Sequence, residues 1–168
     1  MTGTERTEPD LQAPEREMLV GWLDYYRATL AMKCAGLTPG QLRERAVPPS
    51  TISLLGLVRH MADMERGWFR QVLAAEDAPD RYRLPDNPDG DFDDVDTAEP
   101  EADFRAWREE CAAARRIVAA APSLEITGTQ DDETFSLRWI LTHMIAEYSR
   151  HLGHADLIRQ RIDGATGE

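Results

Sequence analysis

The chain has 168 residues, enough for one domain with a sizeable core. It carries 31 acidic and 19 basic residues, a net charge of −12, and this balance argues against binding to nucleic acid or to an anionic membrane surface. No run of about 18 apolar residues is present and residues 1–10 do not resemble a signal peptide, so we expect a cytoplasmic protein without a membrane span.

The first predicted elements are helices separated by breaks at glycine and proline. A helix is expected over residues 14–36, because proline and glutamates suit its first turn, apolar residues recur at helical spacing and a glycine ends it. A Thr-Pro-Gly-Gln capping box predicts a short second helix over residues 38–45. Ser50 or Thr51 can cap the next helix, which carries an apolar stripe and ends near Ala75.

Residues 76–103 differ in character from the predicted helices. They hold 12 acidic and two basic residues, four of the ten prolines and a net charge of −10. We interpret this segment as a solvated acidic loop that crosses over the helices and is mobile relative to them. A lid or a docking surface is the alternative, and the sequence does not distinguish the two.

The second half of the chain predicts two more long helices. The first covers residues 101–121 and ends at a proline. The second covers residues 137–162, can be capped by Thr134 or Ser136, and ends at Asp-Gly. Two short strands between them, in residues 123–135, are an open alternative to a loop. The pattern predicts an all-α fold, an up-down-type four-helix bundle with a long crossover between its second and third helices. We expect a single domain over residues 1–168, with residues 1–12 flexible.

Two residue types are expected in the core. Cys34 and Cys111 lie 77 residues apart in Ala-rich helical stretches, which predicts buried inert thiols rather than a disulfide or a zinc site. The tryptophans fall one on each long helix, which predicts packing roles rather than a ligand-binding box. They are Trp22, Trp68, Trp107 and Trp139.

The scarce histidines are the most informative feature. Three of the four lie inside the last predicted helix, within the 12-residue stretch 143–154. At about 100° per residue, His143, Glu147 and His151 lie at about 0°, 40° and 80°, and His154 lies at about 20°, so all four share one face. His60 can add a ligand from a facing helix, and two histidines with one glutamate form a known catalytic zinc set. Spacing alone leaves His143–Glu147 and His151–His154 as rival ligand pairs, and leaves ordinary core or solvated roles open for each residue.

Two stretches of the sequence resemble a known family. They are Ser53–Phe69 (SLLGLVRHMADMERGWF) and His143–Arg159 (HMIAEYSRHLGHADLIR). These stretches resemble the DinB-like superfamily of metal-binding four-helix bundles, and the resemblance extends over residues 14–164. The superfamily includes thiol-dependent S-transferases and mycothiol-dependent maleylpyruvate isomerase, and the branch that the chain looks most like is actinobacterial.

The resemblance implies a metal site at named positions. The ligand from the second long helix falls on His60, and the two ligands from the last helix fall on Glu147 and His151. Many members have histidine where Glu147 stands, whereas the isomerase-like branch has glutamate. The same resemblance implies that His143 and His154 lie behind the ligands, where they orient a ligand or move a proton.

The resemblance also implies a class of activity. It implies an enzyme that uses a divalent metal, zinc or nickel, and a low-molecular-weight thiol of the mycothiol type on a small electrophilic substrate, by S-transfer or isomerisation. A metal-dependent hydrolase and a stress-linked metal-binding bundle without turnover are the alternatives, and a homodimer is open. No cluster of Arg or Lys marks a carboxylate pocket near the triad, where Arg59, Arg150 and Arg159 are the only nearby candidates.

Overall fold

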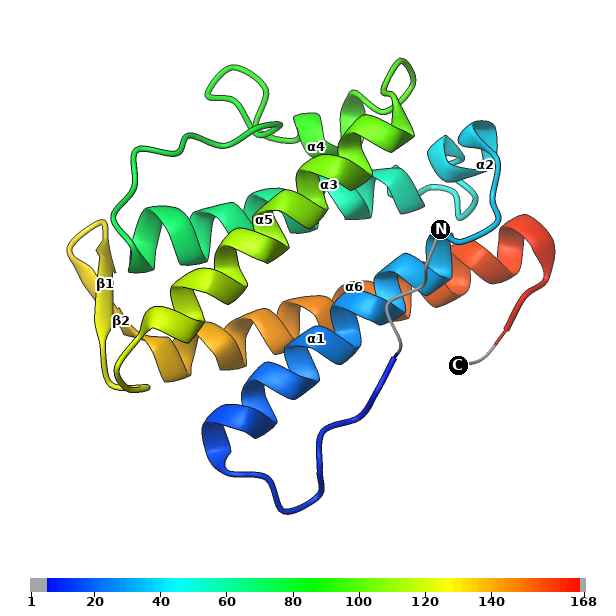
Figure 1. Cartoon of the computed structure of the whole chain (residues 1–168). Coiled ribbons are helices and arrows are strands. Elements are labelled where there is room, and N and C mark those ends of the chain that lie inside the picture. Colours follow the sequence, from blue (N-terminus) through cyan, green and yellow to red (C-terminus); the bar gives the residue numbers. More distant parts are fainter. Residues whose placement is uncertain (1–5, 167–168) are drawn as a thin grey trace.

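Four long helices form most of the chain (Figure 1). The computed structural model describes residues 6–166. Its long helices are α1 (Glu15–Cys34), α3 (Leu54–Glu65) continued by η1 (Arg66–Leu73), α5 (Pro100–Ala120) and α6 (Leu137–Asp163). The short elements are α2 (Pro39–Arg43), α4 (Gly90–Asp93), β1 (Thr127–Gln130) and β2 (Glu133–Ser136).

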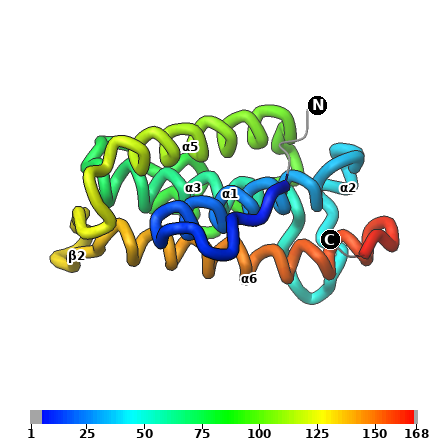
Figure 2. The backbone as a smooth tube through the Cα atoms, turned by 60° about the horizontal axis from the view of Figure 1, so that its bottom comes forward, coloured from blue at the N-terminus to red at the C-terminus, as the bar shows by residue number. Residues whose placement is uncertain are grey.

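The long helices pack in pairs. Helix α1 lies along α6, α3 lies along α5, and α3 also contacts α6. Figure 2 shows the helices running beside one another, with α5 at one edge and α6 at the other. The predicted all-α class is confirmed, and the hairpin of β1 and β2 is the only sheet in residues 6–166.

Local sequence signals explain most helix ends. The side chain of Thr38 accepts a hydrogen bond from the Gln41 backbone, and the Gln41 side chain accepts one from the Thr38 backbone, so the predicted capping box is confirmed. Ser136 caps α6, and Gly164 ends it in the left-handed conformation at φ 78°. Each of these signals is local, which is why the sequence predicts them well.

Helix α3 begins later than predicted and changes its winding. Its cap is Ser53, whose buried hydroxyl accepts the Gly56 N–H at 3.1 Å, rather than Ser50 or Thr51. The Ser50 hydroxyl instead accepts the Ile52 N–H in a turn outside the helix. Residues 66–73 of the predicted helix form the π-helix η1, a form that is frequent at functional sites.

Strands β1 and β2 form a tight hairpin that packs against η1. Strands β1 and β2 pair antiparallel with Thr127 opposite Ser136, and the two-residue turn Asp131–Asp132 has positive φ at both positions. Gly128 packs against η1 so closely that a Cβ atom would lie 2.0 Å from the Val72 carbonyl oxygen. This contact ties the hairpin to the end of η1.

The acidic crossover is held to the helices at several points. The carboxylate of Asp63 on α3 accepts three consecutive backbone N–H groups, those of residues 81–83, at 2.8–3.1 Å. Ala78, Asp91 and Val95 are buried, so the prediction of a solvated loop is wrong for these residues. The segment also ends earlier than predicted, because α5 begins at Pro100.

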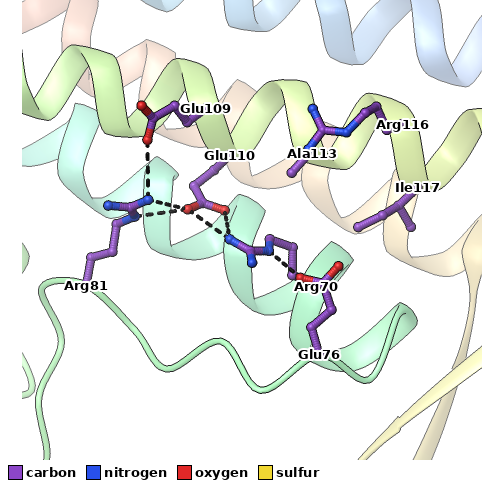
Figure 3. Close-up of a pocket in the computed structure, with 8 residues that line it drawn as sticks. All are labelled: Arg70, Glu76, Arg81, Glu109, Glu110, Ala113, Arg116 and Ile117. Atoms are coloured by element: carbon purple, nitrogen blue, oxygen red, sulfur yellow. Dashed lines mark hydrogen bonds and ion pairs between the residues drawn. The ribbon is translucent and has the colours of Figure 1, made fainter.

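A group of arginines gives the crossover a further attachment. Arg81 of the crossover and Arg70 of η1 both bind the buried carboxylate of Glu110 on α5, at 2.9 and 3.3 Å, as Figure 3 shows. Arg66 binds the same carboxylate at 2.7 Å. Arg70, Arg81 and Glu110 border a cavity of about 270 Å³. The three guanidinium groups that bind Glu110 attach the crossover and η1 to α5.

The core contains the predicted cysteines but not every predicted tryptophan. Cys34 and Cys111 are free and buried, and burial raises the pKa of Cys34 to about 12 and raises that of Cys111 further. Trp107 is buried and its indole N–H donates to the Tyr148 hydroxyl at 2.9 Å. The prediction of a core role is wrong for Trp139, which is 43% exposed.

The described residues before α1 form no regular element. The expected flexible stretch, residues 1–12, falls partly on residues 1–5, which lie outside the described residues. Residues 6–12 form no helix or strand, and the guanidinium of Arg6 lies 4.9 Å from the ring centre of Tyr25. No helix within residues 6–166 has the length and apolar character needed to cross a membrane.

Candidate metal centre

Three ligand-bearing side chains converge where α3 and α6 meet. His60 comes from α3, and Glu147 and His151 come from α6. One ligand atom from each lies within 4.8 Å of the other two. In the part of the chain that the structure describes, no other group of three His, Cys, Asp or Glu side chains converges in this way. The rings of His60 and His151 lie 4.7 Å apart, centre to centre.

A buried carboxylate fixes the orientation of His60. Asp91, on α4 of the crossover, places Oδ2 2.8 Å from Nδ1 of His60. A carboxylate only accepts hydrogen bonds, so Nδ1 carries the proton and Nε2 keeps its lone pair. The ring of Phe92 stacks on His60 at 5.2 Å and 28°. Carboxylate–histidine pairs of this kind commonly support metal ligands.

Asp91 is the functional candidate that sequence reasoning missed. It is one of 12 acidic residues in the crossover, and no spacing distinguishes it from the others. Its side chain is 2% exposed, whereas the neighbouring Asp93 is exposed. A buried carboxylate needs a partner, but the burial of Asp91 is visible only in the structure, so the sequence carries no signal that singles it out.

The two candidate ligands on α6 lie one helical turn apart. Oε2 of Glu147 lies 3.4 Å from Nε2 of His151, and Oε1 forms an ion pair with Arg150 at 2.9 Å. Burial, assisted by the neighbouring His60, lowers the pKa of His151 to about 4, so its imidazole is neutral at neutral pH. Metal ligation needs the neutral form.

The two remaining histidines flank the three. The ring of His154 lies 5.4 Å from that of His151, edge to face. His143, one turn before Glu147, contacts the rings of both Trp68 and Trp139, at 4.9 and 4.8 Å between ring centres. Burial lowers the pKa of His143. The structure therefore brings His143 to an aromatic group and His154 to the side of a ligand.

Comparison with known proteins identifies the family. A family model described as mycothiol S-transferase matches residues 18–164. The chain belongs to the mycothiol S-transferase family. This match confirms the resemblance to the DinB-like superfamily, and it covers the chain from α1 to the end of α6. A search of curated proteins finds no match.

The donor atoms of this mycothiol S-transferase family member fit a divalent ion. Zinc and its neighbours bind both imidazole nitrogens and carboxylate oxygens, so two of the former with one of the latter suit such an ion. Nδ1 of His151 and Nδ1 of His154 are buried with no hydrogen-bond partner among residues 6–166. If all three residues bind one tetrahedral ion, one position is left for an exogenous group.

The nearby cations of this family member are already engaged. Arg59 donates to the Asp94 carbonyl at 2.6 Å and lies 4.4 Å from the ring centre of Tyr82. Arg159 donates to carbonyl groups at the end of α1, and Arg150 binds Glu147. Each of these three guanidinium groups therefore already has a partner within the protein.

Proposed function

We propose that the chain is a metal-dependent thiol transferase that joins a low-molecular-weight thiol of the mycothiol type to a small electrophile. The observation that carries the proposal is the convergence of His60, Glu147 and His151, with one ligand atom from each within 4.8 Å of the others, in a member of the mycothiol S-transferase family. Zinc suits this donor set best, and nickel is the alternative. The four long helices are then the four-helix bundle of the DinB-like superfamily.

The role of the metal in this proposal is to activate a thiol. A divalent ion held by the three residues would lower the pKa of a thiol bound at the open position, so that a thiolate forms near neutral pH. The chain's own cysteines do not supply the nucleophile, because both are buried with raised pKa values. The reacting thiol therefore comes from a cosubstrate.

The protein's own residues hold this arrangement in place. Asp91 fixes the ring of His60, and the i, i+4 spacing of Glu147 and His151 presents both side chains from one ridge of α6. His154 and His143 are candidates to orient a ligand or to accept the proton that the thiol releases. We also propose a cytoplasmic location, where such thiols are kept reduced, and a homodimer remains a prediction for analytical ultracentrifugation.

Metal analysis and thiol consumption test the proposal together. The purified protein is assayed for one divalent ion per chain and for electrophile-dependent loss of thiol, with and without a chelator. His151→Ala should lose nearly all of its metal, whereas the matched variant His143→Ala should keep most of it. Full metal retention in His151→Ala contradicts the assignment of the ligands. Metal binding without any thiol consumption contradicts the transferase and supports a bundle without turnover.

A further inference from the structure

The metal ligands belong to a longer row of side chains. On α6, four side chains follow one another at intervals of four residues and form one ridge: Trp139, His143, Glu147 and His151. The facing helix runs antiparallel, since His60 lies opposite His151 at one end of the contact. At the other end Trp68 of η1 lies opposite His143. The seam between α3–η1 and α6 thus has a metal end and an aromatic end.

Four rings gather at the aromatic end, and we name them the aromatic cluster: Trp68, Phe135, Trp139 and His143. Trp139 stacks on His143 at 4.8 Å and 10°. The ring of Trp68 lies 5.1 Å from each of Phe135 and Trp139. Trp139 is nevertheless 43% exposed, and it is the only aromatic residue among the exposed large hydrophobic side chains of residues 6–166. An indole held by three rings and still open to solvent presents a rigid flat surface.

This flat surface lies within reach of the metal end. Residues four apart on a helix are displaced by about 6 Å along its axis, so Trp139 lies about 12 Å from Glu147, with His143 between them. A small planar molecule resting on the exposed part of Trp139 would therefore lie about two helical turns from Glu147. The position suits the second substrate of a reaction whose thiol is held at the metal.

Charge narrows the class of molecule that fits. Beside the ridge, Arg150 is bound to Glu147, and Arg138 is bound to Glu15 and Glu125 at 2.7 Å each. Because both arginines already have carboxylate partners, neither offers the aromatic end of the seam an unpaired cation for a carboxylate. An anionic substrate is disfavoured, and an uncharged flat molecule is favoured.

We propose that the aromatic cluster is the electrophile subsite and that it selects planar, uncharged aromatic or conjugated electrophiles. The inference rests on the proposed function and adds the class of its second substrate. In the reaction with a halogenated nitroarene, the thiolate sulfur forms a bond to the ring carbon and the halide leaves with its bonding electron pair. The thiol proton passes to water, so the reaction needs no oxidant or reductant.

The test compares two uncharged electrophiles on the metal-loaded protein. They are 1-chloro-2,4-dinitrobenzene, which is planar, and iodoacetamide, which is aliphatic. We expect Trp139→Ala to raise KM about tenfold for the planar compound and less than about twofold for iodoacetamide, since stacking is lost only for the flat ring. Trp139→Phe should restore most of the affinity. Leu157→Ala, which alters another exposed apolar residue of α6, is the control and should change neither value.

A second measurement does not depend on turnover. Two-dimensional NMR of the indole N–H groups is recorded while 2,4-dinitroaniline, a planar analogue without a halide leaving group, is added. A saturable shift of the Trp139 signal supports the subsite even if no thiol is consumed, in which case only the proposed function fails. Equal loss of activity toward both electrophiles in Trp139→Ala, or no saturable shift in the wild-type protein, overturns the inference.

Discussion

Replacing Asp91 by asparagine should weaken metal binding without removing any ligand. Oδ2 of Asp91 lies 2.8 Å from Nδ1 of His60, and its side chain is only 2% exposed. The carboxylate holds the imidazole in the form whose Nε2 carries the lone pair, and its negative charge makes that nitrogen a better donor. An amide can keep a hydrogen bond but not the charge, so orientation is partly kept and donor strength is lost.

The expected size of the effect follows from the supporting role of Asp91. Changes to carboxylates that support a ligating histidine typically reduce metal affinity about 10- to 100-fold, which corresponds to about 1.4–2.7 kcal/mol. The fold should survive, because a neutral hydrogen bond between the introduced amide and the His60 ring still satisfies the buried groups. We expect the metal-free variant to lose about 1 kcal/mol of unfolding free energy.

Competition with a chromophoric chelator measures this affinity directly. Asp93→Asn is the matched control, because it removes the same charge from the same short helix at an exposed position. The control should bind metal as the wild-type protein does. Equal affinity in Asp91→Asn and wild type, or an equal loss in Asp93→Asn, would refute the reasoning that the pair with His60 tunes the ligand.

Three further changes test the site and the fold. Glu147→His should keep the metal but raise the charge of a divalent site from about +1 to about +2, which should lower the pKa of a bound water or thiol. A pH titration of the cobalt-substituted wild type and variant measures this pKa. Coincident midpoints would place Glu147 outside the coordination sphere. Glu110→Gln should lose about 3 kcal/mol of unfolding free energy at neutral pH, because three arginines lose their buried counter-charge; denaturant titration measures this loss. Burial raises the pKa of Glu110, but hydrogen bonding to Arg81 and the charge of Arg66 outweigh burial and lower the folded-state pKa below its usual 4.5. The stability that the ionised Glu110 gives the wild-type protein over Glu110→Gln is therefore complete above pH 4.5, and it is lost as the pH falls through the lowered pKa. Gly128→Ala should lower the unfolding free energy by about 2 kcal/mol, because the added Cβ would meet the carbonyl of Val72. Gly153→Ala is the control, because open space surrounds that position, and it should not lower the unfolding free energy. Thermal melts of both variants measure the difference.

Local signals made much of the fold predictable. The cap of α6 at Ser136, its end at Gly164 and the capping box at Thr38 depend only on residues within one turn, and all three are observed. The start of α3 could not be read in the same way, because three hydroxyl residues stand close together before it. Ser53 becomes the cap because it alone is buried against the helix that it begins.

The crossover shows where composition misleads. Its 12 acidic residues suggest a segment that is solvated throughout. Composition, however, cannot show which individual side chains of the segment are buried. The structure instead attaches the crossover through Asp63 to three backbone N–H groups and through Arg81 to Glu110. Each of these partners is at least 18 residues away along the chain. Limited proteolysis remains the test of whether the segment is nonetheless mobile.

The choice between rival ligand pairs required the second helix. Along α6 alone, His143–Glu147 and His151–His154 fit an ion as well as Glu147–His151 does, because helical spacing is the same or similar for each pair. The antiparallel contact with α3 removes this ambiguity: His60 meets His151, while His143 meets Trp68 two turns further along. A ligand set that includes His60 must therefore use the end of the seam at His151. The same geometry leaves His143 beside an exposed indole, so one pairing of helices decides both where an ion can be held and which neighbouring surface a second substrate would meet.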